Sequence, residues 1–168
     1  MEGSFVSEPT QPIVEQIADA IAAQLATITV ANGYRITVAG VVRPTRMGHV
    51  VDPIADKTIV LSQGGATRAK ALDHAGNPAG LAWTQDFQAD CYRRSSDTAT
   101  TPVDQLFNIF AAECQKAIMA DPQWGGLALL TDLTDVTIFE DITGGMGGVI
   151  VGFAVTYRVK ETDPYAQA

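Results

Sequence analysis

The sequence predicts a single α+β domain, in which two main helices pack on one face of a mainly antiparallel sheet. Two stretches repeat apolar residues at helical spacing, and several other stretches are rich in β-branched residues. Hairpin-type connections on both sides of the second helix favour antiparallel pairing. The chain of 168 residues has the usual size of one domain. We therefore expect the order α-β-β-β-α-β-β, with one extra strand left open, in one domain at 12–160, with an N-terminal arm at 1–11 and a C-terminal tail at 161–168.

The first predicted helix covers residues 12–29. Proline is tolerated at a first helical position such as Pro12, because its missing amide hydrogen would be unpaired there anyway. One face of the helix is apolar and carries Ile13, Val14, Ile17, Ile21 and Leu25. Asn32-Gly33 then turns the chain, because both residues accept positive φ angles.

Two strands are predicted next, at 34–42 and 57–62, joined by a loop at 44–56. Both are rich in Ile, Val and Thr. Residues 63–80 contain four glycines and a proline. This composition favours a mobile connection, and a hairpin or an exposed loop fits it equally well.

Residues 81–94 show the clearest strand alternation in the chain. Apolar side chains share one face, and polar ones such as Asp86 and Asp90 share the other. The stretch is longer than the usual strand of about five or six residues. It therefore suggests an extended hairpin arm or a sheet that continues across subunits.

The second helix is predicted to start at Thr101-Pro102, with Thr101 as its N-cap and Asp104 in its first turn. Its apolar face carries Val103, Leu106, Phe107, Phe110, Cys114 and Ile118. It ends before Pro122. Strands at 127–133 and 136–142, separated by Thr134-Asp135, a glycine loop at 144–148 and a final strand from Val149 complete the prediction.

No residue pattern in the chain predicts catalysis, a cofactor or a metal site. Glu140 and Asp141 are neighbours on a predicted strand and so point to opposite faces. The glycine loop lacks the Lys-Ser/Thr of a phosphate-binding loop. His49, His74, Cys91 and Cys114 have no ligand spacing, and the serines at 62, 95 and 96 have no neighbouring histidine. We expect both cysteines to be reduced, and the sequence leaves their pairing open.

Composition instead favours a protein with covered surface. Charged residues make up only 18% of the chain, so much of its surface is polar-neutral or contacts another molecule. The net charge of −8 argues against a general nucleic-acid binder. The chain has no apolar run near the roughly 20 residues of a membrane span and no features of a signal peptide.

Several residues are candidates for an interface. Asp86 and Asp90 form an acidic strip, and Arg93 and Arg94 suit a solvated strand end or an intersubunit ion pair. Trp124 either binds a partner or packs into the core at the end of the second helix. The segment Asp163-Pro164-Tyr165 is either a disordered tail or a docking peptide, and we expect a neighbouring subunit or another partner to order it.

The chain resembles the tail terminator, or tail completion, proteins of long-tailed bacteriophages. The features that carry the resemblance are the long first helix, the long strand 81–94, the second helix that leads through Asp121-Pro122 into Gly125-Gly126-Leu127-Ala128, and the ending Phe153-Ala154-Val155-Thr156-Tyr157-Arg158 with Asp163-Pro164-Tyr165. The resemblance covers most of the chain from about residue 12.

The resemblance implies a structural virion protein that forms a ring, typically a hexamer, on the last ring of tail-tube subunits. Such a ring ends tube growth and provides the surface that the head connector or stopper protein binds. DNA would pass through its lumen only as cargo, and the family has no catalytic residues. Another neck component, such as a head completion or stopper protein, and a tail-tube subunit are the nearest alternatives. A small enzyme or ligand-binding domain is the alternative of another class.

Overall fold

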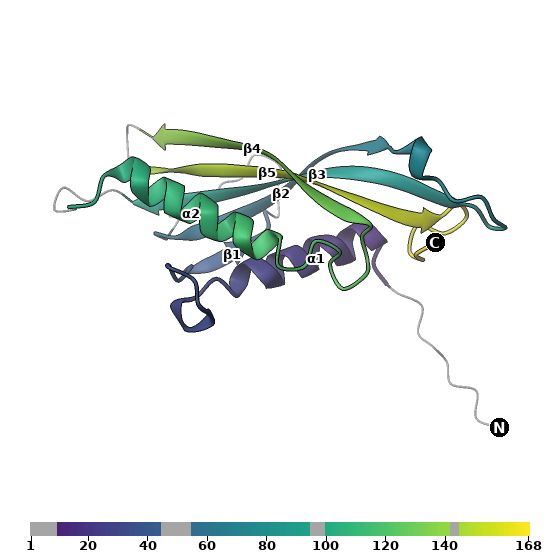
Figure 1. The fold of residues 1–168 in the computed structure, drawn as a ribbon, viewed down its shortest axis with the longest axis horizontal. Coiled ribbons are helices and arrows are strands. Elements are labelled where there is room, and N and C mark those ends of the chain that lie inside the picture. The colour runs from purple at the N-terminus through teal and green to yellow at the C-terminus, as the bar shows by residue number, and fades with distance from the viewer. Residues whose placement is uncertain (1–9, 45–54, 95–99, 142–144) are drawn as a thin grey trace, which may run out of the picture.

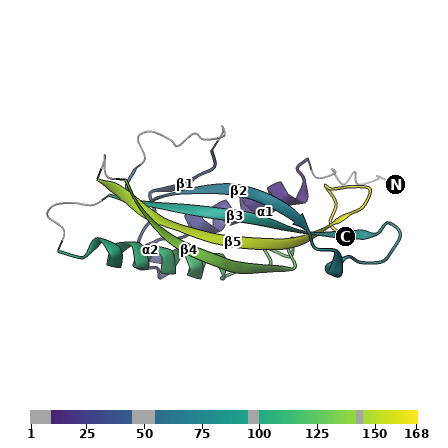
Figure 2. The same ribbon diagram turned by 90° about the horizontal axis from the view of Figure 1, so that it is seen from above.

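The computed structural model describes residues 10–44, 55–94, 100–141 and 145–168, and shows an α+β fold (Figure 1). Within these residues one five-stranded sheet has the order β1-β2-β3-β5-β4, and two helices lie along one of its faces (Figure 2). The elements in chain order are α1 (Ile13–Ala26), β1 (Gly40–Val42), β2 (Thr58–Arg68), β3 (Gly80–Arg94), α2 (Val103–Ile118), β4 (Leu130–Asp141) and β5 (Met146–Lys160). The predicted fold class is confirmed.

The last strand of the chain, β5, lies inside the sheet between β3 and β4. It pairs antiparallel with β3 over its whole length, from Gly80 opposite Lys160 to Arg94 opposite Met146. β4 pairs antiparallel with its other side, and only β1 and β2 are parallel. The two edges of the sheet are therefore the three-residue β1 and the twelve-residue β4.

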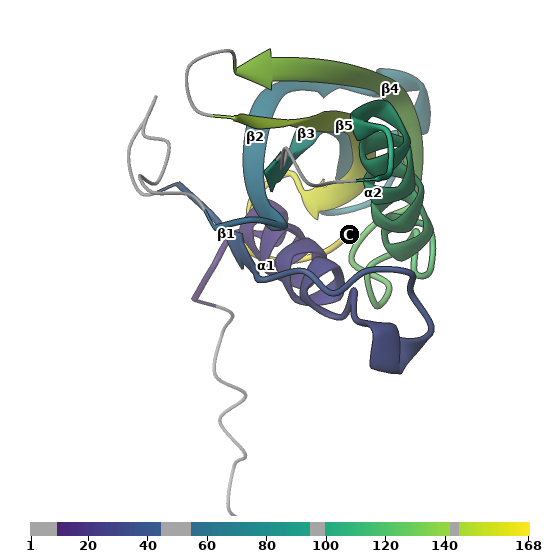
Figure 3. The ribbon, with the colours of Figure 1, turned by 90° about the vertical axis from the view of Figure 1, so that its left-hand side faces the viewer.

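The core lies between the helices and the concave face of the curved sheet (Figure 3). The predicted apolar face of α1 is buried at Ile13, Ile17, Ile21 and Leu25. On β3 and β5 the rings of Phe87 and Phe153 stack with their centroids 5.6 Å apart. α2 adds the buried side chains Phe107, Phe110, Cys114 and Ile118. The helical and strand periodicities of the sequence thus predict the core correctly.

The first predicted strand is mostly not a strand. α1 ends at Ala26, a short 3-10 turn follows at Val30–Asn32, and only Gly40–Val42 of the predicted 34–42 pairs in the sheet. The preceding backbone bonds elsewhere, because the Arg35 amide donates to Glu113 Oε2 (3.1 Å) and the Val38 amide to the Ile28 carbonyl (3.0 Å). The predicted cap of α2 is also wrong, since Pro102 takes the N-cap position without a side-chain bond.

Residues 63–80 form a hairpin, one of the three alternatives that the sequence left open. β2 continues to Arg68, and a 3-10 turn at Lys70–Leu72 leads back into β3. The Arg68 guanidinium donates two hydrogen bonds to Asp73, whose Oδ1 also accepts the Ala82 amide (2.8 Å). The hydrogen bond from Arg68 lowers the pKa of Asp73 below its usual value, with a smaller effect from the Ala82 amide.

The predicted break at Thr134-Asp135 is a β-bulge and not a loop. The register of β4 against β5 shifts between Leu133 and Asp135, and pairing then continues to Asp141. A bulge places an extra residue in one strand without ending it. The predicted second strand is thus the continuation of the first, and residue 142 lies outside the described residues.

Two glycines of the predicted glycine loop at 144–148 belong to β5. A Cβ atom at Gly148 would lie 2.3 Å from the Cys91 carbonyl oxygen, and one at Gly147 would lie 2.8 Å from the Phe107 ring. These glycines therefore permit close strand and helix packing, which corrects the loop prediction for them.

Candidate interaction surfaces

The free edge strand β4 exposes apolar side chains. Leu133, Val136 and Ile138 are 39%, 45% and 45% exposed. They lie opposite the buried residues Phe153, Val151 and Val149 of β5, and directly paired residues share a face of the sheet. The three side chains thus continue the core face of the sheet beyond the part that the helices cover. We call Leu133, Val136 and Ile138 the β4 strip.

The same strand carries exposed carboxylates beside its bulge. Asp132 and Asp135 are exposed, and the Thr134 hydroxyl donates a hydrogen bond to Asp135 Oδ1 (2.8 Å). Bulges and charges on an edge strand oppose unselective pairing with other strands. The β4 edge is therefore apolar and acidic, and it disfavours pairing with another acidic strand.

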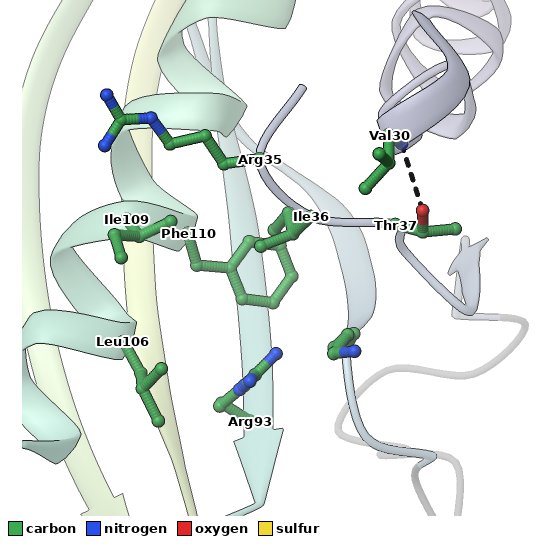
Figure 4. Close-up of a pocket in the computed structure, with 9 residues that line it drawn as sticks. Val30, Arg35, Ile36, Thr37, Arg93, Leu106, Ile109 and Phe110 are labelled. Atoms are coloured by element: carbon green, nitrogen blue, oxygen red, sulfur yellow. Dashed lines mark hydrogen bonds between the residues drawn. The ribbon is translucent and has the colours of Figure 1, made fainter. Parts of the chain in front are cut away.

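A pocket of about 340 Å³ opens between α2 and the segment that leads into β1 (Figure 4). We call it the Arg93 pocket. The side chain of Arg93 points from β3 toward the ring of Phe110, whereas the guanidinium of Arg35 extends across α2, away from Arg93. The pocket is lined by Val30, Arg35, Ile36, Thr37, Lys57, Arg93, Leu106, Ile109 and Phe110.

The lining of the Arg93 pocket has three cations and no carboxylate. The Arg93 side chain is only 18% exposed, and its Nε is buried without a hydrogen-bond partner among the described residues. Its one ion pair with a described residue is long, with 3.9 Å between Nε and Asp56 Oδ1, and that oxygen already accepts the Arg94 amide (2.8 Å). A buried unpaired donor on a charged group is costly. The pocket thus has unused capacity to bind an anion.

The predicted acidic strip on β3 is uneven. Asp86 is exposed on the outer face of the sheet, whereas Asp90 is partly buried there between Val60 of β2 and Ile150 of β5. Asp90 Oδ1 is buried and has no hydrogen-bond partner among the described groups. Burial raises the pKa of Asp90 above its usual value.

Arg93 and Arg94 do not form one basic cluster. Adjacent strand residues point to opposite faces, so Arg93 enters the pocket on the helix side while Arg94 is exposed.

Trp124 lies in the core, as one of the two interpretations of the sequence has it. Its side chain is 3% exposed, and its indole Nε1 donates to Thr131 Oγ1 (2.8 Å). The Thr131 hydroxyl in turn donates to the Pro122 carbonyl (2.8 Å). Trp124 thus joins the turn after α2 to the start of β4.

The C-terminal tail folds back on its own chain. The Pro164 carbonyl accepts the Ile13 amide (3.2 Å), the Ala166 carbonyl accepts the Lys160 amide (3.0 Å), and the Tyr165 amide donates to Asp163 Oδ1 (2.9 Å). Tyr165 itself is 42% exposed. These intramolecular bonds count against our expectation that a neighbouring molecule is needed to order the tail.

The remaining chemical groups do not form a reactive cluster in the described part of the chain. There, no three His, Cys, Asp or Glu side chains gather to hold a metal ion. Cys91 and Cys114 are buried and form no disulfide. The contact with the Cys114 thiol, and to a smaller extent burial, raises the pKa of Cys91 well above its ordinary value. His74 is exposed, while His49, Ser95, Ser96 and the side chains of Glu140 and Asp141 lie outside the described residues.

No family model matches the chain, and no curated protein matches it. None of the helices that the structure describes has the length and apolarity needed to cross a membrane.

Proposed function

We propose that this protein is a structural virion protein that forms a ring at the head-proximal end of a phage tail tube. The ring would end tube polymerisation and provide the surface that joins the tail to the head connector or stopper protein. The virion, assembled in the host cytoplasm, would be its location. It would act without a catalytic residue, cofactor or metal ion, and DNA would only pass through its lumen.

The observation that carries the proposal is the β4 edge. Leu133, Val136 and Ile138 are exposed side by side on a twelve-residue strand whose outer edge no other described strand covers. Exposed apolar patches of this kind, rimmed by polar residues, mark sites of protein association. The low charged fraction of the chain agrees with a protein that buries much of its surface in an assembly.

The resemblance to tail terminator proteins supplies the particular assembly. The long first helix, the long strand 81–94, the second helix that leads through Asp121-Pro122 and the ending that begins at Phe153 are the features that this resemblance uses. A tail-tube subunit or another neck protein would also need such an assembly surface, and these two remain the alternatives.

The test is to add the purified chain to polymerising tail-tube protein from the same phage. We expect closed rings of the chain alone, seen by negative-stain microscopy and native mass spectrometry, and tubes that stop growing when a ring binds one end. Long tubes formed by the chain alone would assign it as a tube subunit. Rings that neither bind nor stop tubes would overturn the terminator function.

A further inference from the structure

The two edges of the sheet differ in the charge around them. All charged residues between Lys116 and Arg158 are acidic, and this stretch contains β4 and most of β5. At the opposite edge, Arg35 precedes β1, Lys57 precedes β2, and both line the Arg93 pocket. In a chain with a net charge of −8, this separation of charge leaves a cationic pocket on one side and an acidic strand on the other.

The other described arginines near α1 and the hairpin are neutralised within the chain. Arg43 pairs with Glu15 (2.8 Å) and Asp19 (2.6 Å), and Arg68 pairs with Asp73 (2.8 Å). Arg35 and Lys57 make no ion pair with any described residue, and Arg93 makes only its long contact with Asp56. Two of the three cations of the pocket therefore have no counter-ion among the described residues, and the third has only a long contact.

The chemistry of the pocket fits a carboxylate carried beside apolar side chains. Its walls include Ile36, Leu106, Ile109 and Phe110, which suit an apolar surface better than the sugar-phosphate backbone of a nucleic acid. The β4 edge has both properties on its two faces, because Asp132 and Asp135 pair with Ala154 and Gly152 and so point away from the side that carries the β4 strip. Pairing β4 with β4 of a second copy would instead place acidic strands side by side, which is destabilising.

We propose that the β4 edge of one copy of the protein docks at the Arg93 pocket of a second copy. In this contact the edge of β4 enters the pocket, so that the carboxylates on its outer face turn toward Arg35, Lys57 and Arg93 while the β4 strip on its other face covers the apolar wall. The two surfaces differ, so each copy keeps one free β4 edge and one free pocket for further neighbours. A head-to-tail contact of this kind closes into a ring when its rotation fits.

This inference rests on the proposed ring and names the surfaces that build it. Charge reversal tests it, because the four residues to be changed are not buried. One variant carries Asp132→Lys and Asp135→Lys, and the other carries Arg35→Glu and Lys57→Glu. Each variant alone opposes like charges across the contact, so we expect each to lose the oligomer and run at the monomer mass in native mass spectrometry.

An equal mixture of the two variants should restore the oligomer. The basic β4 edge of one variant then meets the acidic pocket of the other, and the unchanged surfaces match as well, so the rings should contain both chains in alternation. Glu161→Lys, a charge reversal at an exposed residue beyond β5, is the control for charge reversal outside the contact and should leave the oligomer intact. Thermal melting of all variants checks that each remains folded.

The inference is wrong if the β4 variant alone assembles as the wild type does, because the contact would then not depend on opposite charges. It is also wrong if the mixture stays monomeric, or if the wild type is monomeric at every concentration tested. The two proposals fail separately. Loss of tube binding by intact rings would overturn the proposed function only, whereas unchanged oligomers in both reversed variants would overturn the contact only.

Discussion

At the residue scale, the sheet depends on positions where a side chain is either absent or poorly accommodated. Gly148 lies where β5 passes against β3 and the Phe139 ring, and Asp90 lies between apolar neighbours on the outer face. The first position needs the smallest residue, and the second holds a carboxylate in surroundings that disfavour its charge. A substitution at each position should therefore change the stability of the protein in a definite direction.

Gly148→Ala should destabilise the protein by about 2 kcal/mol, because overpacking a tight site typically costs 1–3 kcal/mol. The new Cβ would lie 2.3 Å from the Cys91 carbonyl oxygen, so backbone has to move. Urea unfolding measures the change. Gly65→Ala is the matched control, since nothing lies within 4 Å of a Cβ there, and an equal loss in both variants would contradict the packing argument.

Asp90→Asn should stabilise the protein at neutral pH by about 1 kcal/mol, the scale of a buried polar group without a partner. The pKa of Asp90 is raised in the folded state, so folding favours its protonated form. The stability that this group contributes is complete below its unfolded pKa near 3.8 and is lost as the pH rises through the folded value.

The gain in Asp90→Asn should therefore vanish near pH 3, where the wild-type carboxyl is already neutral. Urea unfolding at pH 3 and pH 7 measures the difference. Asp86→Asn, on the same face but exposed, should change stability by less than about 0.5 kcal/mol at pH 7. A loss of stability in Asp90→Asn at neutral pH would show that the charge is compensated by a partner.

At the element scale, one hydroxyl joins the turn after α2 to the start of β4. Thr131 is 5% exposed, accepts the Trp124 indole and donates to the Pro122 carbonyl. This small network sets where β4 leaves the core and where its exposed edge begins. The network therefore matters for the position of β4 as a whole.

Thr131→Val should cost about 2 kcal/mol, because it leaves a buried indole N–H and a carbonyl unpaired while keeping the volume of the side chain. Thermal or urea unfolding measures the loss. Thr131→Ser keeps the hydroxyl and should cost clearly less. If valine and serine were equally tolerated, the hydrogen bonds would not be what holds the turn.

The sequence predicts a helix or strand well where a single hydrophobic periodicity runs through the whole segment. The alternation of 81–94 and the apolar faces of both helices appear in the structure because burial follows them directly. Residues 34–42 have strand composition, but the Arg35 amide bonds to α2 and the Val38 amide bonds to Ile28, just after α1, instead of to a strand. Composition gives no information on which backbone partner a segment finds.

The candidate surfaces were less predictable than the fold. The Arg93 pocket joins residues 35, 57, 93 and 106–110, which only the tertiary structure brings together. The β4 strip has ordinary strand composition, and its exposure follows from the place of β4 at the edge of the sheet. The sequence indicates Arg93 as an interface candidate. It contains no pattern that would predict an interface role for Arg35, Lys57 or the β4 strip.

At the scale of the whole molecule, the helix layer and the sheet form one core. Cys91 of β3 and Cys114 of α2 are both fully buried in it and contact each other, so reaching either thiol requires the layers to separate. Thiols react through the thiolate, which burial and a raised pKa disfavour.

Both thiols should therefore be unreactive toward a disulfide reagent such as Ellman's at pH 8 in the folded protein, and both should react at once in guanidinium chloride. The rate of reaction without denaturant should follow the rate of opening of the core. Absorbance of the released thiolate measures it. Rapid labelling of one cysteine in the folded protein would show that the core opens locally at that position.

The central place of β5 also matters while the protein is being made. β3 and β4 are both synthesised before β5, yet each pairs with β5 along nearly its whole length. Until the ribosome releases the last segment of this fold, the nascent chain has two long strands without their common partner, and one of them is apolar on its exposed face. Such exposed strands are prone to aggregation, so chaperone supply during translation should influence yield.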